Sequence, residues 1–577
     1  MVFKPETNES LDGTTHNSDS SQHEVLIVGA GFAGIYLLYK LRNAGFDCKI
    51  LEAGDDIGGT WCHNTYPGSR TDTRQPYYQL SIPEVYEVSG FSVKYQCEKK
   101  TLTVGAVLVQ TWTWSEKYPD QAEMLRYFQH VDDMINVKRD VLFGMRVVDA
   151  RFHNESQKWH VATQKGAVMA SKFFIVAAGF ASKPLTPTWD GIEQFEGELY
   201  HTYQWPSDVH LGRKRVALVG TGATGIQVAQ QVAKEAASLT IFQRTPNFCL
   251  PMVQQKLDRK TQLQEVGSLQ QKLDYRLTTF SGHPESFVDR SALDDTPEER
   301  EAFFESLWRT GGFAFWIATY KDILFDREAN RFAYDFWVKK TRARIQGRDK
   351  QDILAPLDPP HPFGTRRPCL EVDFYEQVSR SHVSLVDINK TPILRIVKEG
   401  ILTADGTMHG FDVISIATGF DALTGSLLHM GLHTSKGLPL HEKWAGGVST
   451  YFGMTMAGFP NLFFLFSVHG PTASNGPACI ELQGNWIAET LLKMRRDGVD
   501  SIEPTPEAER SWTKQIHETL EGTMIHETRS WYSGANNPGR EREPLLFFGG
   551  FPSYQRQIHE ALENDFRGFN KTFKHGR

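Results

Sequence analysis

The chain has 577 residues, of which 40% are hydrophobic and 23% are charged, and its formal net charge is −7. This length predicts two or three domains rather than one compact core, and the hydrophobic content excludes a globally disordered chain. Because no dominant basic field is present, we expect no nucleic acid partner and no electrostatic binding to an anionic membrane.

The cysteines and histidines exclude two further classes of protein. None of the six cysteines forms a CxxC or CxxxxC pair, which in a chain this long is typical of a reducing compartment. The same spacing argues against a flavin disulfide reductase, which needs two adjacent cysteines beside its flavin. The twenty histidines are scattered without metal-ligand spacing, so we expect no metal site.

Neither a targeting segment nor a membrane segment is recognisable. Residues 1–22 are polar and rich in Ser, Thr and Asn, which predicts a disordered tail rather than a secretory leader. No apolar run approaches the roughly 18 residues that a membrane span needs. We therefore expect a cytoplasmic protein without a membrane span.

The first ordered segment predicts a strand–turn–helix–strand unit, at residues 25–28, 29–34, 35–44 and 48–52. Its turn contains Gly29, Gly31 and Gly34 in the pattern GxGxxG, which lets a pyrophosphate approach the backbone at the helix N-terminus. Glu52 ends the second strand. A carboxylate there accepts hydrogen bonds from ribose hydroxyls and repels a 2′-phosphate, so this site should take FAD or NAD rather than NADP.

A second unit of the same kind follows at residues 216–219, 220–225 and 238–242. Its second strand is followed not by an acidic residue but by Arg244 and Thr245. A guanidinium and a hydroxyl suit a 2′-phosphate, so this site should bind NADPH; the alternative is a surface arginine on an NAD site. Two sites of opposite preference indicate one enzyme in which NADPH reduces FAD.

The remaining pattern predicts an α/β fold with two Rossmann-like dinucleotide-binding domains and a mostly helical insertion. Charged, helix-favouring residues dominate the insertion, and a proline-rich stretch at 354–362 ends it. Apolar runs at 173–179, 411–419 and 461–468 predict buried strands. We expect a disordered tail at 1–22, an FAD domain at 23–182 and 400–577, an NADPH domain at 183–250 and 362–399, and the insertion at 251–361.

The linker between the two glycine turns carries the pattern FxGxxxHxxxWP at Phe195, Gly197, His201, Trp205 and Pro206. This pattern resembles the fingerprint of the Baeyer–Villiger monooxygenases, whereas related nitrogen- or sulfur-oxidising flavin monooxygenases usually carry a different aromatic residue at the position of Trp205. Further segments match the family at residues 57–61, 66–72, 114–119, 363–368, 417–422, 530–536 and 549–551. The resemblance extends from about residue 25 to residue 566.

The resemblance implies two sets of cofactor contacts. Those to FAD are Gly29, Gly31, Gly34, Glu52, Thr60, Trp61, Cys62, His63, Asp72, Tyr78 and, through its backbone, Val147. Those to NADPH are Arg70, Thr71, Asp72, Gly220, Thr221, Gly222, Ala223, Thr224, Gly225, Ile226, Gln243, Arg244, Thr365, Arg366 and Trp531.

The implied activity is that of an NADPH- and O2-dependent flavin monooxygenase, which inserts one oxygen atom beside a ketone carbonyl and forms an ester or lactone. The family's catalytic arginine corresponds to Arg367, which would stabilise a peroxyflavin, and Asp72 would orient it. Arginine suits this role because it stays protonated, and an anion in a dry pocket needs a fixed cation. Arg366 as the catalytic residue, with Arg367 on the phosphate, is the alternative assignment.

Two other functions stay open at this point: sulfur or nitrogen oxidation on the same scaffold, and a catalytically idle flavin-binding or redox-sensing protein. The expected partners are a small ketone and O2, and the expected state is a monomer or a weak dimer. The fingerprint lies in a linker, so we expect His201 and Trp205 to couple domain position to the catalytic state; plain packing at a hinge is the alternative.

Three segments depart from the family pattern. Residues 93–110 are an addition, for which we expect an extra loop or a short hairpin. Phe180 stands where some members have Gln, so a polar contact beside the flavin should be missing. Residues 469–477 correspond to a variable part of the family's substrate pocket and indicate a substrate range distinct from that of the small-ring enzymes.

Overall fold

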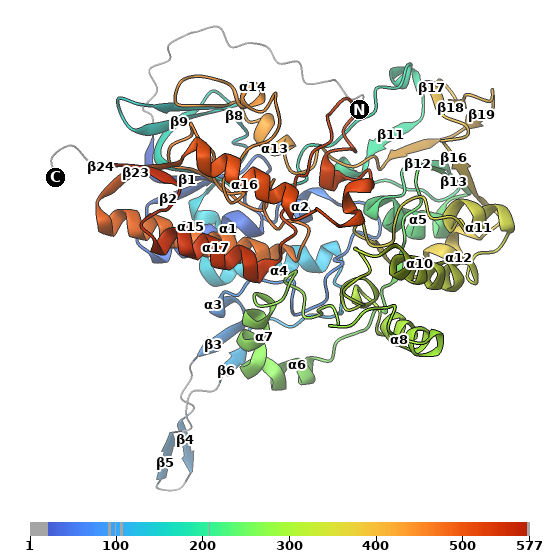
Figure 1. Ribbon diagram of the computed structural model, residues 1–577, viewed down its shortest axis with the longest axis horizontal. Coiled ribbons are helices and arrows are strands. Elements are labelled where there is room, and N and C mark those ends of the chain that lie inside the picture. The colour runs from blue at the N-terminus through green and yellow to red at the C-terminus, as the bar shows by residue number, and fades with distance from the viewer. Residues whose placement is uncertain (1–20, 90–93, 98–99, 104–107, 207, 574–577) are drawn as a thin grey trace.

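The computed structural model describes residues 21–89, 94–97, 100–103, 108–206 and 208–573. Most of the predicted tail and part of the addition at 93–110 lie outside these ranges. Two sheets built mainly of parallel strands dominate the molecule, and helices cover their faces (Figure 1). The predicted α/β architecture with two dinucleotide-binding units is confirmed.

The first sheet has eight strands and carries the first glycine turn. Its order is β21 (Leu432–His433), β8 (Val147–His153), β9 (Lys158–Thr163), β10 (Val168–Val176), β1 (Gln22–Val28), β2 (Cys48–Leu51) and β7 (Val141–Leu142), with β22 (Leu462–Phe464) also beside β10. β1 runs parallel to β2 and β10, and its residues Val25, Leu26 and Ile27 are fully buried. Burial on both faces explains the unbroken apolar run of this strand.

Two helices cover one face of the first sheet. α1 (Phe32–Asn43) follows the glycine turn and packs against α15 (Gly476–Asp497). Gly484 of α15 permits this close approach, because a Cβ atom there would stand 2.9 Å from the ring of Tyr36. α15 thereby brings its first turn, which begins at Gly476, to the cavity described below.

The second sheet has five parallel strands and carries the second glycine turn. Its order is β11 (Glu198–His201), β20 (Val413–Ile416), β12 (Arg215–Val219), β13 (Ser238–Gln243) and β16 (Val383–Asp387). α5 (Ala223–Glu235) connects β12 to β13, as the second predicted unit requires. A small antiparallel sheet adjoins it, made of β17 (Ile393–Val397), β18 (Gly400–Thr403) and β19 (Met408–Gly410).

The position of β20 corrects one predicted boundary. The division at residue 400 assigned this strand to the first domain, but β20 lies between β11 and β12 of the second sheet. A buried apolar run that ends at a glycine looks alike in either sheet, so only strand pairing decides where it belongs. The chain returns to the first sheet after Ile416; the other domain boundaries stay predictions.

The insertion is helical, as predicted, in α6 (Arg259–Glu265), α7 (Leu269–Arg276), α8 (Pro297–Thr310), α9 (Ala314–Ile317), α10 (Arg327–Arg342) and α11 (Arg348–Leu354). α8 begins at a capping box of Thr296 and Glu299, and the Asp326 side chain caps α10. In Figure 1, α8, α10 and α11 gather with α5 and α12 (Phe374–Val378) on one side of the second sheet.

The addition at 93–110 contains a hairpin. β4 (Lys94–Cys97) pairs antiparallel with β5 (Lys100–Thr103), while β3 (Glu87–Ser89) pairs with β6 (Leu108–Gln110). The strands project from the lower edge of the molecule in Figure 1. The expected short hairpin is therefore confirmed for the strands that the structure describes.

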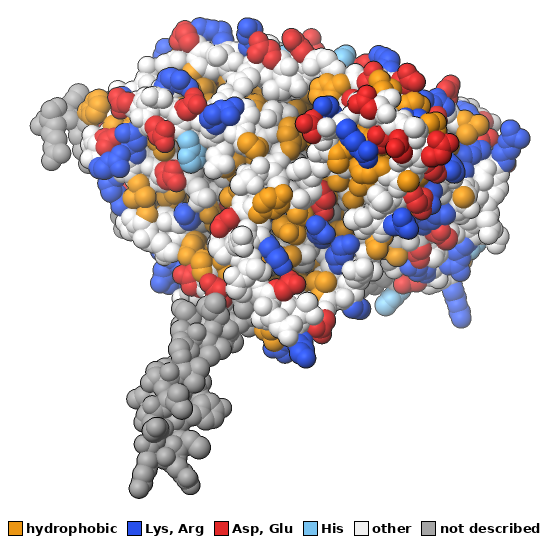
Figure 2. Space-filling model, turned by 60° about the horizontal axis from the view of Figure 1, so that its bottom comes forward, with side chains coloured by type: hydrophobic (Ala, Val, Ile, Leu, Met, Phe, Trp, Pro, Cys, Tyr) orange, Lys and Arg blue, Asp and Glu red, His pale blue; other side chains and the backbone are white. Residues whose placement is uncertain are grey.

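The visible surface mixes charges of both signs. Figure 2 shows Lys and Arg side chains among Asp and Glu side chains, without a large field of either sign. Within the described chain, no helix combines the length and apolar character needed to cross a bilayer.

One internal ion pair joins the insertion to the first domain. Arg276 of α7 is fully buried, and its Nη2 lies 2.6 Å from Oε2 of Glu481 in α15. Its Nη1 donates to the carbonyl oxygens of Tyr77 and Gln79, at 2.6 and 3.0 Å. Ser81 donates to both carboxylate oxygens of Glu481, at 2.7 and 2.6 Å. These contacts hold residues 77–81 between α7 and α15.

We predict that Arg276→Met lowers the free energy of unfolding by about 3–5 kcal/mol, because it leaves Glu481 buried without a countercharge. Denaturant unfolding of the FAD-loaded protein measures the change. The matched control, Arg331→Met, removes an exposed pair with Asp335 and should cost less than about 1 kcal/mol. Equal midpoints for both variants would contradict the prediction, and adding Glu481→Leu to Arg276→Met should restore part of the loss.

Candidate active site

A single large cavity, of about 2420 Å³, lies at the carboxyl ends of the parallel strands of both sheets. This volume is more than twice the roughly 1,000 Å³ of the largest ordinary ligand pockets. Both glycine turns border it. Ligands of open α/β sheets bind at this edge, so the cavity has the position and the size for two dinucleotides.

The first glycine turn is shaped by close backbone contacts. Gly29 has a φ of +102°, and a Cβ atom there would stand 2.6 Å from the carbonyl oxygen of Ala177. A Cβ atom on Gly34 would stand 1.8 Å from the carbonyl oxygen of Gly29. Larger residues at either position would push the helix away from the strand. The cradle therefore fits a pyrophosphate at the N-terminus of α1.

Glu52 closes the same end of the cavity. Its two carboxylate oxygens accept hydrogen bonds from the backbone N–H groups of Ala30 and Gly54, both at 2.7 Å. Burial raises its pKa, but His63 and these two N–H groups lower the pKa more, so the net shift is downward. Glu52 is thus ionised and has free lone pairs for ribose hydroxyls. This arrangement fits the FAD site that the sequence predicts.

Other predicted FAD contacts surround this end of the cavity. Thr60, Trp61 and His63 of α2 (Thr60–His63), together with Tyr78 and Val147, border it. The rings of Trp61 and Tyr78 meet edge to face, with centroids 5.9 Å apart. Cys62 of the same helix does not border the cavity. Gly34, whose place is in the close packing of α1 on the turn, does not border the cavity either.

The second glycine turn repeats the geometry of the first. Gly220 has a φ of +111°, and a Cβ atom there would stand 2.4 Å from the carbonyl oxygen of Ala417. A Cβ atom on Gly225 would stand 2.1 Å from the carbonyl oxygen of Gly220. Predicted residues that border the cavity here are Arg70, Thr71, Gly220, Thr221, Gly222, Ala223, Thr224, Arg244, Arg366 and Trp531. Those that do not are Gly225, Ile226, Gln243 and Thr365.

Arg244 and Arg366 bring two positive charges close together at the border of the cavity. Burial and, to a smaller extent, the nearby charge of Arg244 lower the pKa of Arg366 to about 10. The Nε atom of Arg366 is buried and has no hydrogen-bond partner among the described residues. An anionic group bound between the two arginines would relieve both the repulsion and the missing hydrogen bond. The 2′-phosphate of NADPH has the required charge.

Asp72 and Arg367 meet in the wall of the cavity, although 295 residues separate them. Arg367 Nε lies 2.9 Å from Asp72 Oδ2, and Nη2 lies 3.0 Å from Oδ1. Burial opposes ionisation of both groups, yet their mutual attraction leaves the pKa of Asp72 lowered and that of Arg367 raised. The structure thus makes the contact that the family resemblance implies.

Aromatic residues of the insertion complete this site, and the sequence did not indicate them. Arg367 lies over the ring of Phe313 at 4.7 Å and over that of Trp316 at 5.9 Å. His283 is also buried nearby, and burial together with Arg367 lowers its pKa to about 3, so its imidazole is neutral. No local pattern in the sequence could have identified these residues, because only tertiary packing brings the insertion to Arg367.

Three further aromatic residues, Phe180, Phe466 and Trp531, line the cavity. Phe180 stacks on Trp531 with centroids 5.4 Å apart, and it meets Phe466 edge to face at 5.3 Å. Phe180 offers no hydrogen bond, as the sequence led us to expect. The three rings give the cavity an apolar wall.

The linker fingerprint lies outside the cavity. His201 ends β11 and is 1% exposed, its Nδ1 accepts a hydrogen bond from the backbone N–H of Tyr203 at 3.2 Å, and burial lowers its pKa to about 4. The Trp205 carbonyl oxygen accepts a hydrogen bond from Thr65 Oγ1 at 2.8 Å. Phe195, Gly197 and Pro206 also lie away from the cavity lining. The five fingerprint residues therefore lie away from the cavity lining, whereas Tyr203, between His201 and Trp205, borders the cavity.

The cavity is bordered by two glycine turns, with Glu52 at the first site and Arg244 at the second. This combination is that of a flavin- and nicotinamide-dependent oxidoreductase. A family model described as pyridine nucleotide-disulphide oxidoreductase matches residues 23–264. Among the residues whose side chains the structure describes, Cys48, Cys62, Cys249, Cys369 and Cys479 are free thiols.

Known proteins resemble the whole chain. FAD-binding monooxygenase acrE of Aspergillus aculeatus is 43% identical over 96% of this chain and 89% of that protein. Cyclopentanone 1,2-monooxygenase of Comamonas sp. is 38% identical over 96% of this chain and 97% of that protein. The crystal structure of cyclohexanone monooxygenase from Rhodococcus sp. Phi1 bound to NADP+ is 31% identical, with a TM-score of 0.89, and covers 96% of this chain and 100% of that one.

The chain belongs to the Baeyer–Villiger monooxygenase family. Membership confirms the predicted class, an FAD-containing and NADPH-dependent monooxygenase, and it favours ketone oxidation over the heteroatom alternative. The roles of individual site residues stay predictions.

We predict that Arg244→Ala raises the KM for NADPH about 10- to 100-fold, the effect of losing one or two charged hydrogen bonds to a phosphate. The KM for NADH should change little, because NADH has no 2′-phosphate. Steady-state oxidation of both nucleotides measures the difference. Equal effects on both would contradict a phosphate site at Arg244.

Proposed function

We propose that this protein converts a ketone into an ester or lactone with O2 and NADPH, and that Arg367 is its catalytic arginine. The observation that carries the proposal is the Arg367–Asp72 pair, which borders the same cavity as both glycine turns. Relatives named as acting on ketones, cyclopentanone 1,2-monooxygenase and acetone monooxygenase, support the choice of substrate class.

FAD, once reduced by NADPH, supplies the activated oxygen when it is bound. The contribution of Arg367 is a permanent positive charge at a fixed place in the cavity wall. Asp72 holds the plane of the guanidinium through two hydrogen bonds, and Nη1 donates to the Ala473 carbonyl oxygen at 3.2 Å. Negative charge that develops on oxygen beside Arg367 is therefore stabilised without reorganisation of the site.

The aromatic surroundings strengthen this effect. Phe313 and Trp316 cover the guanidinium on one side, and the Arg367 side chain is 19% exposed. Since charges interact more strongly where water is excluded, the same arginine stabilises an anion better here than at the surface. Phe180, Phe466 and Trp531 extend the apolar wall towards the substrate region. Together these rings favour an apolar ketone and exclude water from reactive oxygen.

We predict that Arg367→Ala loses ester formation by about 100-fold or more, the usual effect of removing one group that stabilises an oxyanion. The variant should keep FAD, accept hydride from NADPH and release hydrogen peroxide instead. Product analysis by mass spectrometry over a ketone panel, with a peroxide assay, measures both outcomes. Arg366→Ala is the matched control: if it, rather than Arg367→Ala, abolishes ester formation, the two roles are exchanged.

We also propose that the fingerprint couples domain position to catalysis through His201 and Trp205. Its contacts to Tyr203 and Thr65 support this role, because they join the linker to itself and to the first domain. His201→Ala should lower the ester formed per NADPH oxidised and raise peroxide release, whereas FAD content stays unchanged. Wild-type coupling in this variant would instead indicate plain packing at the hinge.

A further inference from the structure

Asp72 and Arg367 are connected not only directly but also through a strap of four chain segments, residues 69–75, 115–121, 250–257 and 367–371. Residues 69–75 bind residues 115–121 through Gln75 N–H to Lys117 O at 2.8 Å and Thr71 N–H to Pro119 O at 3.1 Å. The loop that carries Asp72 is therefore fixed along its length by a neighbouring backbone segment.

The strap continues from residues 115–121 to Arg367. Lys117 N–H donates to Gln255 O at 2.8 Å, and Leu257 N–H donates to Ser115 O at 2.9 Å. Further along, β14 (Leu250–Pro251) pairs parallel with β15 (Leu370–Glu371), three residues after Arg367. The two members of the ion pair thus lie at opposite ends of one hydrogen-bonded path.

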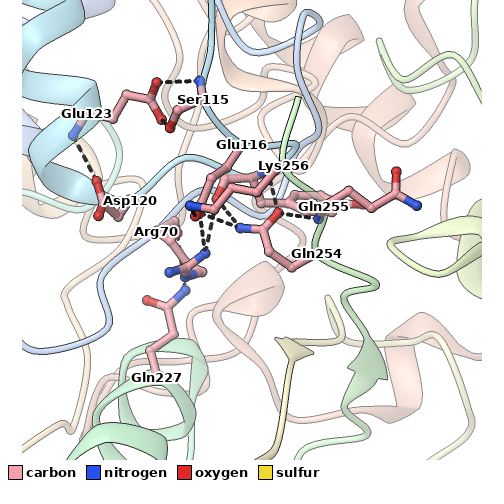
Figure 3. A network of polar contacts seen from close by, with 10 residues as sticks. Arg70, Ser115, Glu116, Asp120, Glu123, Gln227, Gln254, Gln255 and Lys256 are labelled. Carbon is pink, nitrogen blue, oxygen red and sulfur yellow. Dashed lines mark hydrogen bonds and ion pairs between the residues drawn. The ribbon is translucent and has the colours of Figure 1, made fainter. Parts of the chain in front are cut away.

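Glu116 is the polar centre of the strap (Figure 3). Its Oε2 accepts from Arg70 Nη1 at 3.3 Å and from Gln254 Nε2 at 2.8 Å, and its Oε1 accepts from Lys256 Nζ at 2.6 Å. Arg70 comes from the Asp72 loop, whereas Gln254 and Lys256 come from the segment that follows β14. One carboxylate therefore holds together the two halves of the path.

Glu116 remains ionised in this position. Partial burial raises its pKa, but Lys256 and Arg70 lower the pKa more, so the net shift is downward. The Glu116 side chain is 19% exposed, whereas the Lys256 side chain is 83% exposed. The partly buried contacts to Arg70 and Gln254 should consequently matter more than the exposed one to Lys256.

A second contact joins the same loop to the second domain. Gln227 of α5 donates from Nε2 to the Arg70 carbonyl oxygen at 3.1 Å, and its Oε1 accepts from Tyr66 Oη at 3.0 Å. Gln227 borders the cavity directly after the second glycine turn. The loop thus lies between Glu116 on one side and the nucleotide-binding helix on the other.

We propose that Glu116 is a positioning residue: by holding Arg70 against Gln254, it keeps the Asp72 loop in register with β14 and β15 and so sets the orientation of Arg367. The inference rests on the proposed function of Arg367. Glu116 does not border the cavity, and it acts through the strap rather than on a ligand.

The test compares Glu116→Gln, which keeps the shape but removes the charge, with Glu305→Gln, which makes the same change at the Lys340 ion pair of the insertion. Hydrogen exchange of the FAD-loaded proteins, without NADPH or ketone, reports on the strap. In Glu116→Gln the amides of Thr71 and Gln75 should exchange about tenfold faster, because local opening becomes easier. In Glu305→Gln they should exchange as in the wild type.

Turnover provides the second readout. Ester formed per NADPH oxidised should fall at least about twofold in Glu116→Gln and stay at the wild-type value in Glu305→Gln. Unchanged exchange together with unchanged coupling would overturn the proposal. A wild-type protein that makes no ester from any ketone would instead refute the proposed function, and the exchange result would still be interpretable.

Two further variants separate the contacts of Glu116. Gln254→Met removes the contact of Gln254 to Glu116 together with its hydrogen bonds to the backbone of Tyr118 and Gln255. It should shift exchange and coupling in the same direction as Glu116→Gln, which keeps the test possible if the latter fails to fold. Lys256→Met removes only the exposed ion pair and should resemble the wild type. If Lys256→Met alone reproduced the full effect of Glu116→Gln, the assigned role of the Arg70 and Gln254 contacts would be wrong.

Discussion

The ion pair between Arg367 and Asp72 is the interaction on which the rest of the site depends. A guanidinium that faces an apolar cavity loses solvation, and two hydrogen bonds to one carboxylate offset that loss. Because the partners are 295 residues apart, the pair forms only when the first-domain loop and the segment before β15 are both in place. Its geometry is therefore a property of the assembled fold rather than of either segment.

The two dinucleotide sites share the same glycine-turn backbone but differ in the charge of the residue at the end of the second strand. In each, a strand ends at a glycine of positive φ whose missing Cβ leaves room for a neighbouring carbonyl oxygen. The difference lies after the second strand, where one unit has the ionised Glu52 and the other has Arg244 close to Arg366. Electrostatic preference, not backbone shape, thus distinguishes the site predicted for FAD from the site predicted for NADPH.

The helical insertion does more than extend the second domain. Its Arg276 pairs with Glu481 of α15, and its Phe313 and Trp316 cover the guanidinium of Arg367. Residues 250–257 of the strap lead into the same insertion. The insertion therefore contacts both the first domain and Arg367.

The sequence by itself determined the local units: both glycine turns, the charges at Glu52 and Arg244, the fingerprint and, through family resemblance, the importance of Arg367 and Asp72. These features are recognised from residues that lie close together in the sequence, so the sequence alone is enough to find them. Only the tertiary structure decided that β20 belongs to the second sheet, that His283 and Phe313 lie beside Arg367, and that Glu116 connects Arg70 to Gln254. Strand pairing and side-chain contacts between distant segments leave no periodic trace in a sequence, because they are selected by packing in three dimensions.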